Sequence, residues 1–524
     1  MTRPAPSSPT AADPTADHPP GDTEALRRRC GGLPPLSARL EPWMRELLAD
    51  RRACSALIEE YGSPVNVHEF SALARNASEL ESAAARHGVP LRIFVARKAN
   101  KTLGLVESAR RAGHGVDVGS HRELSQVLDQ GYAPEDVVVT AAVKPPELLR
   151  LVRDTGVVLV LDNLDEAEAF LQVAAENRTG GRQPVALRLA PTPTSGIAPT
   201  RFGESAATWQ HWADHARTSA AGLRIDGVHF HLHGYAAQHR ALALDEALRL
   251  GDALRDLGHD LRFIDIGGGV PMSYLDDAGQ WDAFWTAHDA STSDGADAVT
   301  WRGEPLRQVY PYHQEPVRGE WLEQVLGTRL PTGETAAVAL RERGLELRCE
   351  PGRSLLDGCG LTLSRVVQRT TTSDGVPLVG LEMNRTQCRS TSDDFLVDPL
   401  LVPGDGPRSA PLHAFLVGAY CIEAELILRR RLDFPQGVAI GDLLAFPNTA
   451  GYLMHILESA SHQIPLASNV VLGPEGPQRD AIDAVSPLRP WAEEPAPEAG
   501  RAARISGRPA PPPGTGSGGC RTRG

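Results

Sequence analysis

Two short motifs carry side chains that could perform imine chemistry. Lys98 ends the apolar run FVARKANK, and a lysine held near apolar walls has a depressed pKa and can form an imine with an aldehyde. Glu350 and Arg353 flank a Pro-Gly turn in CEPGRSL, where a carboxylate can keep a pyridine nitrogen protonated and a guanidinium can bind a phosphate. Each motif has an ordinary alternative, because lysines often extend to solvent at strand ends and Glu–Arg pairs are common in surface turns.

A glycine triplet supplies a candidate phosphate site. Gly267, Gly268 and Gly269 follow an apolar run in FIDIGGGVP, and residues without side chains let backbone N–H groups approach a phosphate. A triplet alone does not identify a site. Its place after a predicted strand favours this interpretation, because the last loops of a parallel barrel often bind phosphate.

The elements that must position these residues repeat one pattern from Val65 onward. A short β-branched run is followed by a polar or glycine-containing turn and then by an amphipathic helical stretch. Eight such units with short buried strands favour a closed (β/α)8 TIM barrel over an open sheet. The strand candidates are VNVHE (from Val65), RIFVA (Arg92), GVDV (Gly115), VVVTA (Val137), VVLVLD (Val157), VALRL (Val185), GVHFHL (Gly227) and FIDIGGG (Phe263).

Polar and glycine residues recur where these strands end. In a parallel barrel the carboxyl ends of the strands converge on one face, so these residues are expected to surround one site. The alternative is that strand ends are loops, and loops are polar in any case. The residues are Lys98, Asp117, Lys144, Asn163, Arg188, His231 and Gly267 to Gly269.

The chain is predicted to be an α/β protein, a (β/α)8 TIM barrel plus a C-terminal antiparallel β domain. The change to short strands with Gly/Pro turns after ELRCEPGR marks the second domain, and the Pro-rich ends predict disorder. The predicted parts are a disordered tail (1–35), a segment packing on the β domain (36–64), the barrel (65–345) with an aromatic-rich insertion (about 276–344), a β-sandwich or β-barrel domain (346–474) and a second disordered tail (475–524).

Composition favours small-molecule chemistry. With a net charge of -13, the 524-residue chain has no broad attraction for nucleic acid or an anionic membrane. Its beginning has no apolar segment of the kind found in secretory signals, so we expect a cytoplasmic protein. Seven scattered cysteines without a CxxC pair predict neither a disulfide framework nor a metal site.

Several motifs, in order, resemble one family. VARKANK, GVDVGSHRE, FHLHG, IDIGGG, CEPGR and TAGY are similar to motifs of the alanine racemase-like (fold type III) decarboxylases that use pyridoxal 5'-phosphate. This family includes the diaminopimelate, ornithine and arginine decarboxylases. The resemblance extends from Tyr61 to Met454, and it implies that an amino acid is decarboxylated to an amine and carbon dioxide.

The resemblance also implies roles for single residues around the cofactor. It makes Lys98 the Schiff-base lysine, His231 the imidazole stacked on the cofactor ring, and Glu350 the partner of the pyridine nitrogen. It implies no metal. The further cofactor-binding residues that it implies are Asp117, Arg188, Gly267, Gly268, Gly269, Arg353 and Tyr452.

The family's C-E-S-G-D motif reads here as Cys421 to Glu425. In the family, this cysteine comes from the second subunit of a head-to-tail homodimer and protonates Cα after carbon dioxide leaves. The alternative is a buried cysteine that only packs. Two departures affect the expected contacts: His233 and Gly234 replace the Gly-Ser of the H-x-G-S motif, and Glu425 replaces the final Asp.

The segment EMNRTQCRSTSDDFLVDPLL and the aromatic insertion resemble the Y4yA-like, siderophore-associated branch. The substrate stays open: a basic or diamino acid, or an amino-acid conjugate. A racemase and a non-catalytic binding homologue are the alternative functions. The residues expected to bind substrate are Arg385, Arg389, Glu423 and Glu425, and both arginines could equally be ordinary surface charges.

Overall fold

The structure is a computed structural model, which describes residues 23–176, 182–219, 222–291, 298–390 and 395–485. Residues 1–22 and 486–524 of the two predicted tails lie outside the described residues. Within the described ranges, no helix combines the length and the apolar character needed to cross a membrane.

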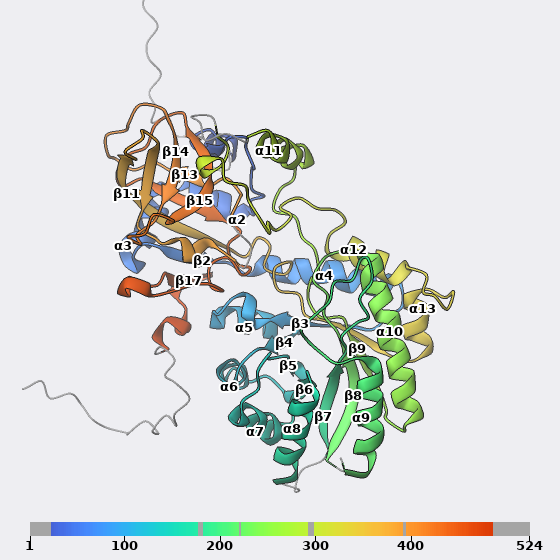
Figure 1. The fold of residues 1–524 in the computed structure, drawn as a ribbon. Helices are drawn as coiled ribbons and strands as arrows, with labels where there is room; N and C mark the ends of the chain where they lie inside the picture. The colour runs from blue at the N-terminus through green and yellow to red at the C-terminus, as the bar shows by residue number, and fades with distance from the viewer. Residues whose placement is uncertain (1–22, 177–181, 220–221, 292–297, 391–394, 486–524) are drawn as a thin grey trace, which may run out of the picture. The chain divides into compact units, whose positions relative to one another are not determined.

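Eight parallel strands close into a barrel (Figure 1). Every described residue of β4, β5 and β6 is buried, as expected for strands covered on both faces. The predicted (β/α)8 barrel is thus confirmed. Its strands are β3 (Leu91–Ala96), β4 (Gly115–Val118), β5 (Val137–Val139), β6 (Val158–Leu161), β7 (Gln183–Arg188), β8 (Leu223–His229), β9 (Phe263–Asp265) and β10 (Glu346–Cys349).

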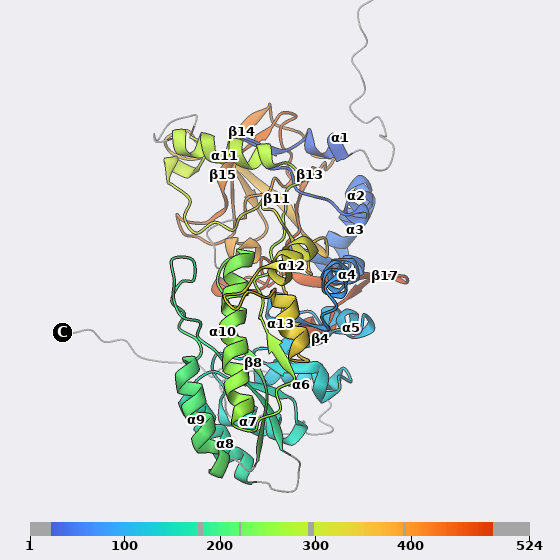
Figure 2. The ribbon, with the colours of Figure 1, turned by 90° about the vertical axis from the view of Figure 1, so that its right-hand side faces the viewer.

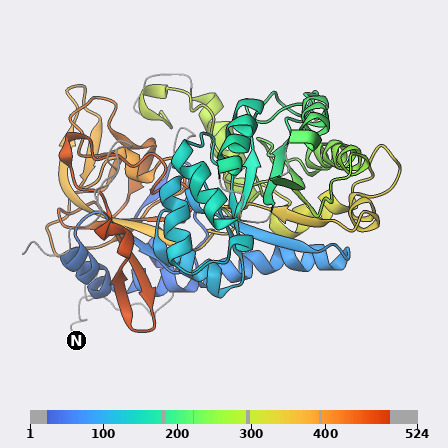
Figure 3. The same ribbon diagram turned by 90° about the horizontal axis from the view of Figure 1, so that it is seen from below.

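Helices cover the outside of the barrel, and Figures 2 and 3 show α8, α9 and α10 beside its strands. Local signals fix their ends: Ser120 accepts the N–H of Glu123 to cap α6, and Gly156 ends α7 in a left-handed conformation. The helices are α4 (Ser71–Arg86), α5 (Leu103–Arg111), α6 (His121–Asp129), α7 (Pro146–Thr155), α8 (Leu164–Glu176), α9 (Ala206–Ser219), α10 (Ala237–Asp256), α12 (Arg318–Gly327) and α13 (Ala336–Glu342).

The interior of the barrel is filled by side chains. Phe94, Val138, Val160, Ala186 and Phe263 form one buried cluster contributed by five strands. The interior of the barrel is therefore a packed core, and active sites of such barrels lie at the carboxyl-end face.

One strand assignment from the sequence is wrong. VNVH forms β2 (Val65–His68), which pairs with strands of the β domain and not with the barrel. The eighth barrel strand is β10, which pairs in parallel with β3 and β9. Both strands are short and buried, so hydrophobic pattern alone could not distinguish them.

The second sheet is mostly antiparallel, with parallel pairings of β2 with β17 and of β12 with β14. Its long strand β11 pairs with β2, β12 and β16. The strands besides β2 are β1 (Gly31–Gly32), β11 (Gly360–Thr371), β12 (Pro377–Leu381), β13 (Leu400–Val402), β14 (Leu412–Val417), β15 (Leu426–Phe434), β16 (Leu443–Pro447), β17 (Ser468–Gly473) and β18 (Gly476–Arg479).

The chain before the barrel packs on this sheet. Helices α2 (Pro42–Ala49) and α3 (Arg51–Tyr61) bury Met44 and Leu57 in one cluster with Leu361 of β11. The predicted N-terminal tail is wrong for residues 23–35, because helix α1 (Thr23–Arg27) buries Leu26 and strand β1 pairs with β15. The second predicted tail likewise begins too early, since β18 pairs with β17.

The predicted insertion divides into two parts. Helix α11 (Ala278–Ala290) and the tyrosines that follow it share a hydrophobic cluster with the β domain, in which Phe284 is buried beside Leu428. Helices α12 and α13 pack against α4 and α10 and lead into β10. The second part is therefore a normal helical layer of the barrel.

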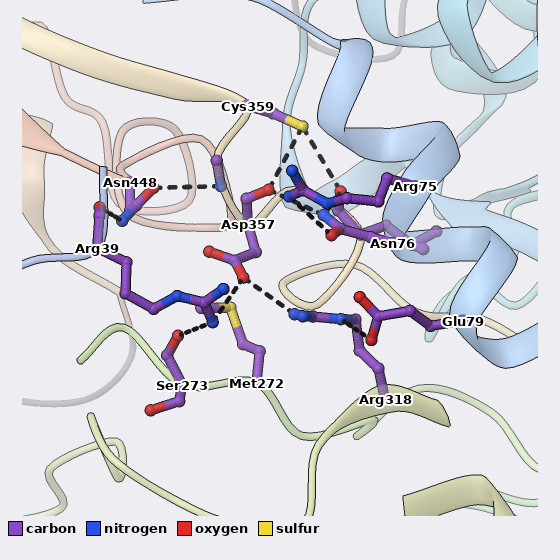
Figure 4. A network of polar contacts seen from close by, with 12 residues as sticks. Arg39, Arg75, Asn76, Glu79, Met272, Ser273, Arg318, Asp357, Cys359 and Asn448 are labelled. Atoms are coloured by element: carbon purple, nitrogen blue, oxygen red, sulfur yellow. Dashed lines mark hydrogen bonds and ion pairs between the residues drawn. The ribbon is translucent and has the colours of Figure 1, made fainter. Parts of the chain in front are cut away.

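A buried carboxylate ties the junction between β10 and β11 to its surroundings (Figure 4). Asp357 accepts a hydrogen bond from Arg318 at 2.9 Å, and Arg39 lies 3.6 Å away. Asn76 of α4 donates to the main-chain oxygens of Leu355 and Asp357. The segment that carries Glu350 and Arg353 is thus held from the barrel and from the N-terminal segment.

Candidate active site

Lys98 lies in a short turn directly after β3, and its amine faces Asp117 on the neighbouring strand β4. Lys98 Nζ donates to Asp117 Oδ2 at 3.1 Å, and the Asp117 side chain is 1% exposed. Desolvation by the surrounding protein lowers the pKa of Lys98, but Asp117, Tyr452 and Glu350 outweigh it and hold the pKa above its ordinary value. The depressed lysine pKa expected from the sequence is therefore wrong, because a buried carboxylate stabilises the ammonium.

Glu350 follows β10 and belongs to a buried group of three ionisable residues. His229 Nε2 lies 3.2 Å from Glu350 Oε1, and ligand atoms of His229, Asp265 and Glu350 lie within 4.8 Å of one another. Burial raises the pKa of Asp265 to about 7, and burial together with Asp117 raises the pKa of Glu350. Burial lowers the pKa of His229 to about 4. Three such groups can share protons. Their spacing would also admit a metal ion, and the sequence predicted no metal site.

The glycine loop after β9 has no room for side chains. A Cβ on Gly267 would lie 2.7 Å from the carbonyl oxygen of Phe230, and the residue adopts φ 66°. Gly268 N–H donates to His231 Nδ1 at 3.1 Å, so the proton of this neutral imidazole is on Nε2. Burial lowers the pKa of His231 well below its ordinary value.

Arg240 of α10 binds the glycine loop through its guanidinium. Its buried guanidinium donates to the carbonyl oxygens of Ile266 at 2.6 Å and Gly268 at 2.9 Å. Burial lowers the pKa of Arg240 to about 10. Sequence reasoning missed this residue, since nothing in the sequence of α10 distinguishes it from a surface arginine.

Arg353 points its guanidinium into a group of tyrosines. Its Nη1 donates to Tyr274 OH at 2.8 Å, and its carbon Cζ lies 4.3 Å from the ring centroid of Tyr310 and 5.4 Å from that of Tyr452. A Cβ on Gly352 would lie 2.8 Å from Tyr452 OH, so only glycine fits there. The sequence indicated Tyr452. It missed Tyr310 of the aromatic insertion and Tyr274, which lies between the glycine loop and the insertion.

Hydrogen bonds tie the turn of Lys98 to the turn of Tyr452. Tyr452 N–H donates to Ala99 O at 2.8 Å, and the Asn100 side chain donates to Ala450 O at 3.1 Å. Arg188, at the end of β7, donates to Asp162 at 3.1 Å. The structure thus brings the predicted cofactor-binding residues to the carboxyl-end face of one barrel.

The predicted substrate residues surround the loop between β14 and β15, and the N–H of Arg389 donates at 2.9 Å to the main-chain oxygen of Leu453, the residue after Tyr452. Cys421 and Glu423 are exposed in the single chain. Glu425 is buried and accepts the N–H of Arg385 at 2.8 Å, while Arg389 donates to Leu426 O at 3.4 Å. These contacts help to order the loop, and the substrate-binding role of the four residues stays a prediction.

The residues at the barrel face fit pyridoxal 5'-phosphate. Glu350 Oε1 and Asp265 Oδ2 are buried and have no well-directed hydrogen bond within the described residues, as expected of carboxyls that serve a bound group. The glycine loop, Arg353 and Tyr452 supply N–H, guanidinium and hydroxyl donors for a phosphate. Lys98 supplies the amine. Such a site on a parallel barrel defines an enzyme of pyridoxal chemistry.

Comparison with known proteins identifies the family. A family model described as "Pyridoxal-dependent decarboxylase, pyridoxal binding domain" matches residues 72–296. The protein y4yA of Sinorhizobium fredii, itself uncharacterized, is 32% identical over 444 residues, which cover 83% of this chain and 93% of y4yA. A diaminopimelate decarboxylase of Pseudomonas aeruginosa is 26% identical over 420 residues, which cover 78% and 87% of the two chains.

Solved structures share the fold. Diaminopimelate decarboxylase of Helicobacter pylori superposes with a TM-score of 0.60 at 17% identity, covering 82% of this chain and 97% of that one. The lysine/ornithine decarboxylase of Vibrio vulnificus gives 0.60 at 16%, covering 83% and 99%. The chain belongs to the fold type III pyridoxal-phosphate-dependent decarboxylases, and within them to the Y4yA-like branch.

Proposed function

We propose that this protein decarboxylates an amino acid to the corresponding amine and carbon dioxide, with pyridoxal 5'-phosphate as cofactor. The observation that carries the proposal is Lys98 held at 3.1 Å by buried Asp117 on the barrel face where Glu350 is also buried. The substrate is a basic amino acid, a diamino acid or an amino-acid conjugate. The family of the chain supports this reaction class.

Each residue has a distinct task in the proposed reaction. The bound cofactor supplies an electron sink for the electron pair left on Cα when the carboxylate departs. Glu350 would hold the ring nitrogen in its protonated form, and His231 would present its neutral imidazole to the ring. The glycine loop, Arg353 and Tyr452 would hold the phosphate. Asp117 would orient the amine of Lys98 and stabilise its positive charge when that amine is free.

Cys421 is proposed as the acid that protonates Cα. Its exposed thiol in the single chain suits a residue that is delivered to the site of a second subunit, because a proton donor must reach the reacting atom. We therefore propose a head-to-tail homodimer with shared sites. The cytoplasmic location remains a prediction from the sequence.

The attachment of the cofactor can be tested at one residue. The chain has three lysines, Lys98, Lys101 and Lys144. Borohydride reduction of the holoenzyme, followed by peptide mass spectrometry, is expected to find the pyridoxyl mass on Lys98. An adduct on Lys101 or Lys144, or a visible absorption band that survives in Lys98→Ala, would contradict the assignment.

The reaction is tested with a panel of amino acids and amino-acid conjugates. Carbon dioxide and amine are measured by mass spectrometry, and the remaining amino acid by chiral chromatography. Release of carbon dioxide supports the decarboxylase, whereas loss of optical purity without it indicates a racemase. Cys421→Ala is expected to slow turnover by about 100-fold or more, as for loss of a general acid. Turnover equal to the parent enzyme would refute the role of Cys421.

A further inference from the structure

A second cavity opens beside the proposed cofactor site. Its volume is about 420 Å³, within the range of small-molecule pockets. It lies between the loop that follows β7 and the turn that joins β8 to α10. Pro191 and Phe202 line one side, and His231 and Tyr235 line the other.

Two residues that line this cavity also contact residues of the proposed cofactor site. His231 lines it, and the same imidazole accepts the N–H of Gly268 in the glycine loop. Phe202 also lines it, and the guanidinium of Arg188 lies 4.3 Å from the centroid of the Phe202 ring. A molecule reacting at the barrel face could therefore extend into the cavity.

The polar groups of the cavity suit a negative charge. Arg201, His233, His239 and the hydroxyl of Thr200 line it, and none of its described lining residues is acidic. The exposed side chain of Arg201 lies against the neighbouring ring of Phe202, with its Cζ 3.9 Å from the ring centroid. Helix α10 begins at this cavity without a side-chain cap, so the positive end of its dipole adds to the same potential.

We propose that this cavity receives an anionic group, such as a carboxylate, at the far end of the substrate. This inference rests on the proposed decarboxylase function and selects among its substrates. An ammonium at the far end of a diamino acid would meet Arg201 and the histidines with no carboxylate to pair it. Among the substrate classes left open by the sequence, the cavity therefore favours a conjugate or a diamino acid that carries a second carboxylate over one that ends in an ammonium alone.

The cofactor phosphate is the other anion that the cavity could hold. Arg353, Tyr452 and the glycine loop form a separate set of donors, and none of them lines the cavity. The phosphate thus has its own set of donors. Binding of the phosphate and binding of a substrate carboxylate can therefore be distinguished by experiment.

The test measures the binding of citrate, glutarate and cadaverine to the dialysed holoenzyme by calorimetry at low ionic strength. The carboxylates are expected to bind and cadaverine is not. Arg201→Met should weaken citrate binding about tenfold, the value of one charged hydrogen bond. Arg150→Met, which changes an exposed arginine of α7, is the matched control and should leave binding unchanged.

The outcomes separate this proposal from the proposed function. Cadaverine binding in place of citrate would overturn the anion proposal, and so would citrate binding that Arg201→Met does not weaken. A lower affinity for pyridoxal phosphate in Arg201→Met would assign the cavity to the phosphate and overturn it as well. Citrate binding that depends on Arg201 supports the cavity even if no panel compound releases carbon dioxide, a result that would refute only the proposed function.

Discussion

At the residue scale, the proposed chemistry depends on a few buried ionisable side chains. Glu350 is 3% exposed and lies near Asp265 and His229, and burial with Asp117 raises its pKa. Because burial disfavours the ionised form of a carboxyl, a nearby cation is needed to stabilise the carboxylate in this position. The protonated nitrogen of the cofactor ring would be such a cation, which explains why the raised pKa and the proposed role are compatible.

Glu350→Gln is expected to slow decarboxylation by about 100-fold or more, because an amide keeps the shape but cannot stabilise a positive ring nitrogen. The measurement is kcat together with the visible spectrum of the cofactor. Glu346→Gln, at the start of the same strand β10, is the control, and its rate should stay near that of the parent. Equal rates for the two variants would show that Glu350 has no electrostatic role.

At the element scale, α10 acts on the site through one side chain. Arg240 holds the carbonyl groups of the glycine loop, so replacing it leaves several of them without a donor. We expect Arg240→Met to lower the free energy of unfolding by about 3 kcal/mol and to weaken cofactor binding about tenfold.

Urea denaturation and cofactor titration measure the two effects of Arg240→Met. Arg150→Met is the matched control, because Arg150 of α7 is exposed. It should change stability by less than about 1 kcal/mol. If Arg240→Met lowered stability but left cofactor affinity intact, its proposed positioning of the loop would be wrong.

Site residues that share a short sequence motif could be predicted from the sequence. Contacts between residues far apart in the sequence could not be predicted. IDIGGG and CEPGR carry their own turns, so Gly267 and Glu350 could be predicted as candidate site residues from the sequence, and the two turns follow the barrel strands β9 and β10. Tyr274 and Arg353 are about 80 positions apart, and Tyr274 contacts Arg353 through the fold, where it packs in one hydrophobic cluster with the β domain. The same limit explains β2, whose short buried pattern matches a barrel strand although its partners β11 and β17 follow far later in the chain.

At the scale of the whole molecule, the Asp357 network joins segments that are distant in the sequence (Figure 4). Asp357→Ala leaves the buried guanidinium of Arg318, 5% exposed, with only Glu79 as a carboxylate partner. A loss of about 3 kcal/mol in unfolding free energy is expected, as for half of a buried ion pair. Denaturation curves of Asp276→Ala provide the contrast, since Asp276 is 74% exposed and its loss should change little. Similar losses in both variants would exclude a special role for the network.

The stability of the molecule should also depend on pH through His68. Burial lowers its pKa to about 4, and its Nε2 accepts from Asn100 while its Nδ1 faces Val470 O. Between about pH 6.5 and 4, the unfolded chain therefore binds a proton that the folded chain does not. His68 thus reduces stability by about 1.4 kcal/mol per pH unit as the pH falls through this range.

The pH effect is measured as a difference between His68→Gln and the parent protein. Asp265, whose pKa is raised, has the opposite sign and gains stability on acidification, so the total curve mixes both effects. The difference between the two proteins isolates His68 and should shrink from pH 7 to pH 4.5, because the parent loses more stability. A difference that stays constant with pH would refute the neutral buried imidazole.

The pairing of β2 with β11 has a consequence for synthesis. His68 pairs with Gly360, about 290 positions later. During synthesis on the ribosome, β2 emerges before the barrel strands and cannot pair with β11 until all of them have emerged. All barrel strands have thus emerged before the second sheet can close, and the segment carrying Glu350 and Arg353 emerges between the two. The ability to bind the cofactor should appear late in synthesis, together with the second sheet.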